Sequence, residues 1–507
     1  MTRATSFVLG IVFALPACAT DGQESGHGHI AQTEQLGTVH FATSCNPTVQ
    51  PQFDRAVALL HSFEFGASVR GFNDVLAADS TCAMAYWGLA LSRWGNPTAA
   101  GNRPVTLLQQ GGEWAASGAR LQRISTDRER DYIDAVNQLY DDFQHRDQST
   151  RIDAYSRAME ALTLRQPADT EAKIFYAISL VAAASPTDKT YANQLKAGAI
   201  LEGLWAKQPN HPGLAHYIIH AYDYPALADK ARAAAARYSI IAPSAAHALH
   251  MPSHTFTRVG MWKESVDANE KSSAVALRDG SIAEALHAMD YEMYAYLQLG
   301  DYASAKSILV RLPDIATRFD PNAIGGAAPP SAGYFALAAI PARWALERDA
   351  WAEAAALTPT PTDYLYPEAM TYFARAIGAS HIGDLGKSAA AIDSLAVIQQ
   401  RLAAENESYW AEQVAIQQLG AEAWLELAQR EDQVALQHMR AAAAREDATE
   451  KNAVTPGPLA PAHELLGDML LQLGQPTQAR AEYQLTLQKE PNRRRSLTHL
   501  DKRTAAK

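Results

Sequence analysis

Histidine is concentrated in one part of this chain, because seven of its sixteen histidines lie between residues 211 and 290. Two pairs in this stretch have the spacing i, i+4, namely His216 with His220 and His250 with His254. On a helix, side chains four residues apart share one face with Cβ atoms roughly 6 Å apart, so both rings of a pair can reach one metal ion. The spacing therefore predicts coordination of a metal by imidazole.

The two pairs are in register with each other and with a third stretch. They lie 34 residues apart, a period typical of stacked helix hairpins. A further 40 residues on, the same two positions hold Asp290 and Tyr294, and His287 follows His247 at that interval. At 100° per residue, these positions and Asp223 form a stripe roughly 150° from the side chains that pack inside each hairpin. We therefore expect the stripe to face the concave groove of the stack.

Eight side chains of the stripe are candidate ligands or supports of a metal site. The two histidine pairs converge if neighbouring helices pack about 8 to 10 Å apart. The other four residues then supply third ligands or hold the ligands in orientation. One four-histidine site and two three-ligand sites both agree with this pattern. The eight candidates are His216, His220, Asp223, His247, His250, His254, His287 and Asp290.

The chemistry of these ligands favours a transition metal. Neutral imidazole with little carboxylate suits zinc or copper first, with iron or nickel also possible, and disfavours calcium and magnesium. An ion with an open coordination position could activate water or oxygen, with Tyr294 or Asp290 handling protons, so the site could also belong to a metalloenzyme. The same stripe is compatible with a metal-free groove that binds a protein, peptide or small ligand, and with a structural hydrogen-bond network.

The elements that position these residues are predicted to be helices. From Phe53 onward, Ala- and Leu-rich segments with a 3.6-residue period alternate with short breaks, and no segment shows a convincing strand pattern. The clearest repeat unit lies near the C-terminus. Its marker residues are His463, Leu466, Gly467, Leu470, Ala479, Tyr483 and Pro491.

This unit resembles the tetratricopeptide repeat, and the resemblance covers most of the mature chain. It implies an all-α, right-handed superhelical solenoid of about eight to ten helix hairpins, whose concave groove usually binds a protein or peptide partner. Segments such as HPGLAHYIIHAYD and VTPGPLAPAHELLGDML also resemble a group of exported bacterial proteins of this kind.

The N-terminus has the pattern of an export signal. An apolar run of eleven residues, from Phe7 to Ala17, is too short to span a bilayer. The sequence LPAC ending at Cys18 resembles a bacterial lipobox, which implies a lipid anchor on that cysteine and a periplasmic protein tethered to a membrane. A plain signal peptide cut nearby is the alternative. The predicted parts are signal peptide 1–17, flexible tether 18–38, solenoid 39–500 and polar tail 501–507.

Two cysteines remain if Cys18 carries lipid. Export to an oxidising compartment favours a disulfide between Cys45 and Cys82, which would join the segment before the first helix to the second hairpin. Two buried, unpaired thiols are the alternative.

Pro252 is expected to disturb the second histidine helix. A proline in mid-helix removes one backbone hydrogen bond and restricts the residue before it, so we expect a kink or a late start, with Met251 outside helical geometry. Pro/Gly-rich loops at 320–333 and 358–367 are expected at the mouth of the groove, and a third loop, 452–461, is expected to be packed.

The charge of the chain argues against one class of partner. Its net charge is −11 and it has no long basic run. Binding to nucleic-acid phosphates needs clustered Lys and Arg, so we expect no nucleic-acid partner.

Overall fold

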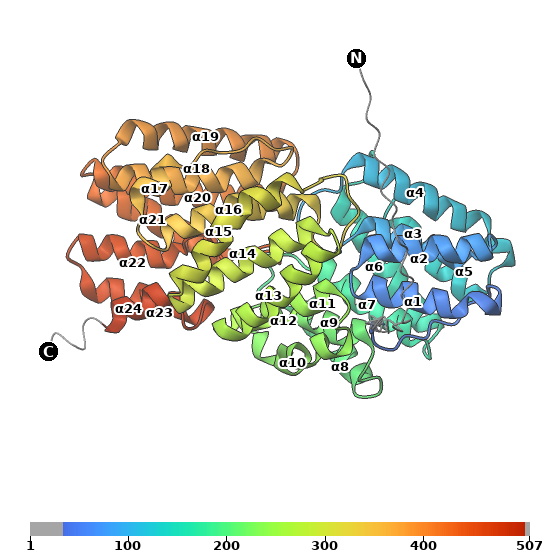
Figure 1. Cartoon of the computed structure of the whole chain (residues 1–507). Coiled ribbons are helices and arrows are strands. Elements are labelled where there is room, and N and C mark those ends of the chain that lie inside the picture. Colours follow the sequence, from blue (N-terminus) through green and yellow to red (C-terminus); the bar gives the residue numbers. More distant parts are fainter. Residues whose placement is uncertain (1–33, 502–507) are drawn as a thin grey trace, which may run out of the picture. The chain divides into compact units, whose positions relative to one another are not determined.

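The computed structural model describes residues 34–501, and its contacts divide the chain into two units, Met1–Glu34 and Gln35–Lys507. The predicted signal peptide, Cys18, the tether up to residue 33 and the tail from residue 502 lie outside the described residues. All regular elements between residues 34 and 501 are helices (Figure 1). The prediction of an all-α solenoid of tetratricopeptide-like hairpins is confirmed.

The N-terminal helices pack as successive neighbours, with each helix against the next along the chain. They comprise η1 (Pro47–Val49), α1 (Gln50–His61), α2 (Phe65–Ala78), α3 (Ala83–Trp94), α4 (Val105–Arg120), η2 (Gln122–Ile124), α5 (Asp127–Gln138), α6 (Gln148–Arg165), α7 (Thr170–Ala182) and α8 (Ala192–Trp205).

The central helices continue the stack and hold the histidine-rich stretch. They are α9 (Pro212–Ala221), η3 (Ala228–Ala231), α10 (Arg232–Ile241), α11 (Ala246–His250), α12 (Pro252–Arg258), α13 (Trp262–Arg278), α14 (Ile282–Leu299) and α15 (Tyr302–Thr317).

The C-terminal helices form regular hairpins in which each helix packs against its neighbours in sequence. They are α16 (Pro330–Leu346), α17 (Trp351–Ala356), α18 (Leu365–His381), α19 (Leu385–Ala404), α20 (Ser408–Ala428), α21 (Asp432–Ala448), α22 (Ala462–Gln472), α23 (Pro476–Lys489) and α24 (Arg494–Asp501).

Local sequence explains where several of these helices begin and end. Proline occupies the first turn of α9, α12, α16 and α23, where its fixed φ suits a helix and its missing N–H has no partner to lose. Gly300 ends α14 at a φ of +73°, a conformation that glycine adopts without strain. Within α22, a Cβ on Gly467 would lie 2.7 Å from the ring of Tyr483, so glycine allows α22 and α23 to approach closely.

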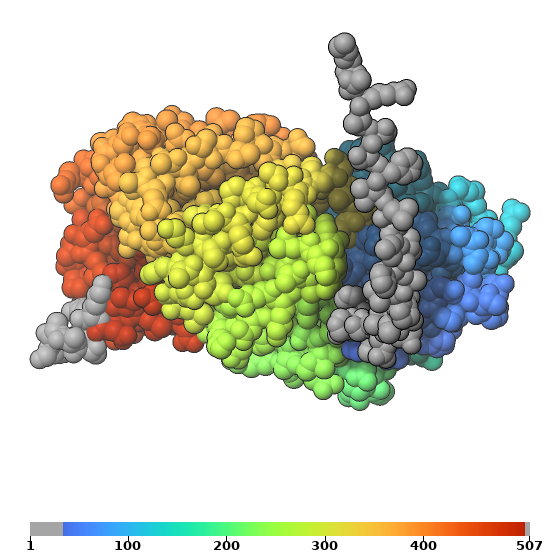
Figure 2. Space-filling model, in the orientation of Figure 1, coloured from blue at the N-terminus to red at the C-terminus, as the bar shows by residue number. Residues whose placement is uncertain are grey.

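The apolar core is divided along the stack, as expected of a repeat protein. One cluster spans the helices from α1 to α10 and includes Phe53, Trp87 and Tyr132. Another spans α16 to α23 and includes Trp410 and Trp424. A smaller cluster on α14, α15 and α16 lies between them. In Figure 2 the green and yellow central segments accordingly lie between the blue N-terminal helices and the orange and red C-terminal helices.

Segments far apart in sequence meet across the central helices. The loop between α21 and α22 contacts the N-terminal half: Lys189 Nζ donates to Thr449 O at 2.6 Å, and Asn452 Nδ2 donates to Thr98 O at 3.2 Å. The loop before α16 contacts α2, where Gly66 N donates to Gly325 O at 2.8 Å. The loop at 452–461 is therefore packed, as predicted.

Two features of the first helices bear on the predicted organisation. Cys45 and Cys82 form a disulfide with a Cα–Cα distance of 4.9 Å, which joins the segment before α1 to the start of α3 as the sequence predicts. The end of the predicted tether is held against the body, since Gln35 N donates to Ser244 Oγ at 2.9 Å and Leu36 is buried. Of the described helices, none combines the length and apolarity that crossing a membrane requires.

Candidate metal centre

The histidine stripe lies on four of the central helices, α9, α11, α12 and α14. His216 and His220 are on α9, His247 and His250 on α11, His254 on α12 and His287 on α14. All six side chains are buried, with exposed fractions of 0 to 6%. The sequence predicts that they line an open groove, but the chain's own loops cover them. The stripe therefore forms an internal site.

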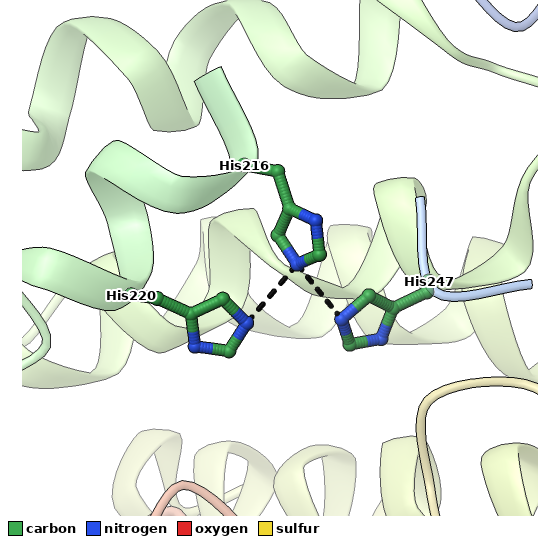
Figure 3. A group of neighbouring side chains, drawn as sticks. All are labelled: His216, His220 and His247. Carbon is green, nitrogen blue, oxygen red and sulfur yellow. Dashed lines mark hydrogen bonds between the residues drawn. The ribbon is translucent and has the colours of Figure 1, made fainter. Parts of the chain in front are cut away.

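The first group consists of His216, His220 and His247, and all three rings point toward one position (Figure 3). His216 Nε2 lies 3.0 Å from His220 Nε2 and 3.2 Å from His247 Nε2. The ligand nitrogens of the group lie within 4.8 Å of one another. We call this group the first triad.

The second group repeats this arrangement one hairpin later and consists of His250, His254 and His287. His250 Nε2 lies 3.0 Å from His254 Nε2, and the ring centroids of His250 and His287 are 4.5 Å apart. We call this group the second triad. Of the two arrangements that the sequence left open, the structure shows two three-histidine groups rather than one group of four.

Hydrogen bonds fix the tautomer of several rings. His216 Nδ1 lies 2.6 Å from the backbone oxygen of His61, and His247 Nδ1 lies 2.9 Å from Glu284 Oε1. A carbonyl or carboxylate oxygen only accepts, so Nδ1 carries the hydrogen and donates in both rings. Nε2 of His216 and His247 therefore presents a lone pair to the centre of the first triad.

The same reasoning applies to the second triad. His254 Nδ1 donates to Asp223 Oδ2 at 2.9 Å, and His250 Nδ1 donates to Asn269 Oδ1 at 2.6 Å. The orientation of the Asn269 amide is set by its Nδ2, which donates to Ser265 O at 2.7 Å. Nε2 of His250 and His254 therefore also presents a lone pair inward.

Each triad thus contains one pair of nitrogens whose lone pairs face each other at 3.0 or 3.2 Å. Two lone pairs at this distance repel, and a proton or a metal ion between them removes the repulsion. Burial lowers the pKa of His216, His250 and His254, which disfavours the protonated form. These pKa directions disfavour a proton as the group that removes the repulsion.

Burial also lowers the pKa of His220 and His287, and neighbouring histidines lower both further. Protonation of one ring would place its charge beside the other rings, so the cluster favours neutral imidazoles at physiological pH. Neutral imidazole is the form that binds a metal.

Two carboxyl groups lie behind His247. Burial alone would raise the pKa of Glu284, but the interaction with His247 keeps it below its ordinary value, so Glu284 is a carboxylate. Burial and the charge of Glu284 raise the pKa of Glu64 to about 8, so Glu64 is largely neutral at pH 7. The backbone N–H of His247 donates to Glu64 Oε1 at 3.3 Å, which helps to fix the start of α11.

The two predicted aspartates have different places. Asp223 supports the second triad through His254 and also accepts from Arg258 Nε at 2.8 Å, so it is an orienting residue. Asp290 lies outside both triads, and the prediction that it serves the metal site is wrong. It is fully buried in an ion pair with Arg343, whose Nε lies 2.8 Å from Asp290 Oδ1.

Tyr294, expected to handle protons at the site, instead contacts the C-terminal segment. Its hydroxyl donates to Glu490 and accepts from Arg493 Nη1 at 2.9 Å. The tyrosine beside the second triad is Tyr291, whose ring centroid lies 4.9 Å from those of both His250 and His254.

Pro252 interrupts the second histidine helix as expected. The helix α11 ends at His250, and α12 begins at Pro252. Met251 nevertheless keeps helical geometry, with φ −52° and ψ −35°, so the prediction that it leaves the helical region is wrong. His254 N donates to Met251 O at 3.1 Å, which gives α12 a tight first turn.

A third group, formed by His61, Glu171 and His211, was not predicted. Each carboxylate oxygen of Glu171 lies 2.9 Å from Nε2 of one ring. The Glu171 carboxylate therefore accepts a hydrogen bond from each imidazole, while His211 Nδ1 is buried without a hydrogen-bond partner. His211 was visible in the histidine-rich stretch, but Glu171 has no motif spacing that would reveal it.

A cavity faces both triads and is lined by His220, His247, His254 and His287. Its other walls come from the loop at 96–100, residues 327–332 at the start of α16, the loop at 452–454, and the rings of Tyr366 and Trp410. Of the two loops expected at the mouth of the groove, 320–333 contributes several lining residues, whereas 358–367 contributes only Tyr366, which lies in the first turn of α18.

Comparisons with known proteins give no family for this chain. Neither known family models nor curated proteins match its sequence. Solved structures that it resembles include the human IFIT1 dimer with m7Gppp-AAAA, at 10% identity and a TM-score of 0.37, with 80% of this chain and 89% of that chain covered. The APC/C hetero-tetramer Cut9–Hcn1 has a TM-score of 0.37 at 13% identity, with 83% and 76% covered. Yeast Tom70 has a TM-score of 0.30 at 11% identity, with 90% and 95% covered.

Proposed function

We propose that this protein is an exported helical solenoid that binds two transition-metal ions, one in each histidine triad. The observation that carries the proposal is the inward-facing pair of Nε2 lone pairs in each triad. Nitrogens that each lie about 2.0 to 2.1 Å from one ion are themselves roughly 3.0 to 3.5 Å apart. The separations of 3.0 and 3.2 Å agree with this requirement.

The ligands favour zinc or copper, with iron as a further candidate. Three neutral imidazoles suit these metals, and the absence of a carboxylate among the ligand atoms of the two triads disfavours magnesium and calcium. Three protein ligands leave an open position on a four-coordinate ion. Carboxylate or amide oxygens behind His247, His250 and His254 hold these rings in orientation, as is usual for metal-binding histidines.

Export and membrane tethering are part of the proposal. The apolar run before Cys18 and the LPAC sequence support a lipoprotein signal, and the disulfide between Cys45 and Cys82 suits an oxidising compartment. We therefore place the mature protein in the periplasm, anchored through lipid on Cys18. Labelling with radioactive palmitate tests this directly, and a Cys18→Ala variant that still incorporates label would contradict the assignment.

Metal content tests the central proposal. Mature protein freed of metal with a chelator, incubated with zinc or copper and then desalted, should retain two ions per chain by elemental analysis. His216→Ala and His250→Ala should each retain one, because each removes the central ligand of one triad. The matched control is His145→Ala, since His145 is exposed and far from the site in sequence; it should retain two ions. Metal near zero in the wild type, or content unchanged in both triad variants, would overturn the proposal.

A further inference from the structure

The two triads are adjacent enough to act as one unit. Ring centroids of His220 and His254, in different triads, are 6.2 Å apart, and those of His247 and His250 are 5.8 Å apart. Within the first triad, the centroids of His220 and His247 are 6.3 Å apart. Rings of different triads are therefore as close as the most separated rings of one triad. The six imidazoles form a continuous cluster, and ions in the two triads would be close neighbours.

Both triads face the same cavity. The cavity is lined by two rings of the first triad, His220 and His247, and two rings of the second, His254 and His287. The central rings, His216 and His250, do not line it. Each triad thus presents two of its three rings to this one space. A small molecule in the cavity would therefore lie next to both triads.

The walls of this cavity fit a small uncharged ligand. Apart from the histidines, the lining is mostly alanine with a proline, a valine and two aromatic rings. Its other polar side chains, besides the Tyr366 hydroxyl and the Trp410 indole N–H, are Asn96, Ser331 and Asn452, and no Asp, Glu, Lys or Arg lines it. A cation would lose its hydration here without gaining a counter-charge, because the lining has no carboxylate and the bound ions would themselves be positive. A neutral molecule of two atoms would lose little.

We propose that the two triads form one dinuclear copper centre that binds dioxygen in this cavity. This inference rests on the proposed metal binding and extends it to a ligand and a metal. Neutral nitrogen ligands support both Cu(I) and Cu(II), whereas zinc has no redox chemistry. Protein sites with two metal ions hold them roughly 3.5 to 4 Å apart, a span that a two-atom ligand can bridge.

The step balances without a further reactant. Each Cu(I) gives one electron, so two Cu(I) become two Cu(II) and dioxygen becomes peroxide, with its O–O bond reduced from double to single. The peroxide oxygens form new bonds to the two copper ions, and no proton is needed. Release of dioxygen reverses each of these changes, so the protein would carry or sense dioxygen unless a second substrate reaches the cavity.

Oxygen uptake and electron paramagnetic resonance (EPR) test this inference together. Metal-free protein is loaded anaerobically with two equivalents of Cu(I), desalted, and exposed to a measured amount of dioxygen. We expect one dioxygen consumed per two copper ions and an EPR signal near zero, because two bridged Cu(II) ions couple. Retention of two copper ions with the EPR intensity of two isolated Cu(II) ions would overturn the dinuclear inference and leave metal binding intact. Failure to retain copper, zinc or iron would overturn both.

Variants keep the test independent of folding. His287→Ala should retain a single copper ion that becomes visible by EPR after oxidation. Ala100→Leu changes only a cavity wall, at a half-buried position. It should retain two copper ions while the rate of oxygen uptake falls at least tenfold. Uptake at the wild-type rate in Ala100→Leu would contradict the assignment of the cavity.

Discussion

At the scale of single residues, the acceptors behind the histidines decide how well each triad holds an ion. Glu284 accepts from His247 in the first triad, and Asp223 accepts from His254 in the second. Burial alone would raise the pKa of Asp223, but the charges of Lys451 and Arg258 hold it well below its ordinary value, so it is a carboxylate. Each carboxylate fixes one ring and increases the basicity of its Nε2.

Replacing either carboxylate should therefore weaken the binding of one metal ion and leave the binding of the other unchanged. We expect Glu284→Gln to lower the affinity of the first triad by about 10- to 100-fold, and Asp223→Asn to do the same to the second triad. Competition with a chromophoric zinc chelator measures the zinc affinity of both triads. Asp267→Asn, at a half-exposed position on α13, is the matched control. An equal loss of affinity at both triads in either variant would show that each carboxylate does not support one triad alone.

The buried histidines should also make the metal-free protein sensitive to acid. The pKa values of His216, His220, His250, His254 and His287 lie below the ordinary value of 6.5 in the folded state. Below pH 6.5 the unfolded chain binds protons that the folded chain does not, so the free energy of unfolding falls as the pH falls. Each histidine contributes up to about 1.4 kcal/mol per pH unit.

Urea unfolding of metal-free protein at pH 7.5, 6.0 and 5.0 measures this loss. The free energy of unfolding should depend less steeply on pH in His250→Ala, because this variant lacks one of the buried imidazoles. It should keep the wild-type pH dependence in His145→Ala, whose ring is exposed. A stability that is flat over this range would contradict the assignment of neutral, buried imidazoles.

At the scale of elements, the first helices depend on a covalent link. The disulfide joins residues 37 apart in sequence, Cys45 before α1 and Cys82 at the start of α3. Closing a loop of this length restricts the unfolded chain, so the double variant Cys45→Ser/Cys82→Ser should lose about 2 to 4 kcal/mol of unfolding free energy. Urea unfolding under oxidising conditions measures the change. The variant should still retain two metal ions, because neither cysteine is near a triad; loss of metal in a folded variant would contradict this separation.

The helices and the two histidine pairs could both be predicted from sequence, because both follow from local periodicity. Helical periodicity and a 34-residue repeat place His216 with His220, and His250 with His254, on one face without any knowledge of tertiary structure. His247 and His287, the third histidines of the two triads, also occupy equivalent positions in successive repeats. Burial of the stripe could not be predicted, because it depends on loops that return from residues 96–100 and 452–454.

The residues that accept hydrogen bonds from the triad histidines could not be predicted from the sequence. His61 lies 155 residues from His216, and Asn269 meets His250 only through the packing of α11 on α13. Asp290 occupied the right repeat position, but its carboxylate is neutralised by Arg343, which lies 53 residues away on α16. Repeat register identifies a shared face, whereas the partner of each side chain on that face is decided by long-range contacts.

At the scale of the whole body from Gln35 to Asp501, Arg343 links the central helices to the loop that covers the site. Besides Asp290, its guanidinium donates to Pro458 O at 3.0 Å and to Gly457 O at 2.9 Å. Burial alone raises the pKa of Asp290, although Arg343 favours its charged form. Loss of the guanidinium would leave a buried carboxylate and two backbone oxygens without this donor.

Arg343→Met should therefore lower the free energy of unfolding by about 3 to 5 kcal/mol, because removing one partner of a buried ion pair leaves the other uncompensated. Adding Asp290→Leu should recover a large part of this loss, since the isolated carboxylate is then gone. Urea unfolding of the two variants measures both effects. A double variant that is less stable than Arg343→Met would contradict this explanation.

The most direct measurement of the central claim is an anomalous difference map, recorded at the absorption edge of the metal from a crystal of zinc- or copper-loaded protein. We predict two peaks per chain, each about 2.0 to 2.1 Å from the Nε2 atoms of His216, His220 and His247 or from one ring nitrogen each of His250, His254 and His287. The two peaks should lie close together beside the shared cavity. A map with no peak among these six imidazoles, in crystals soaked with saturating metal, would contradict the account.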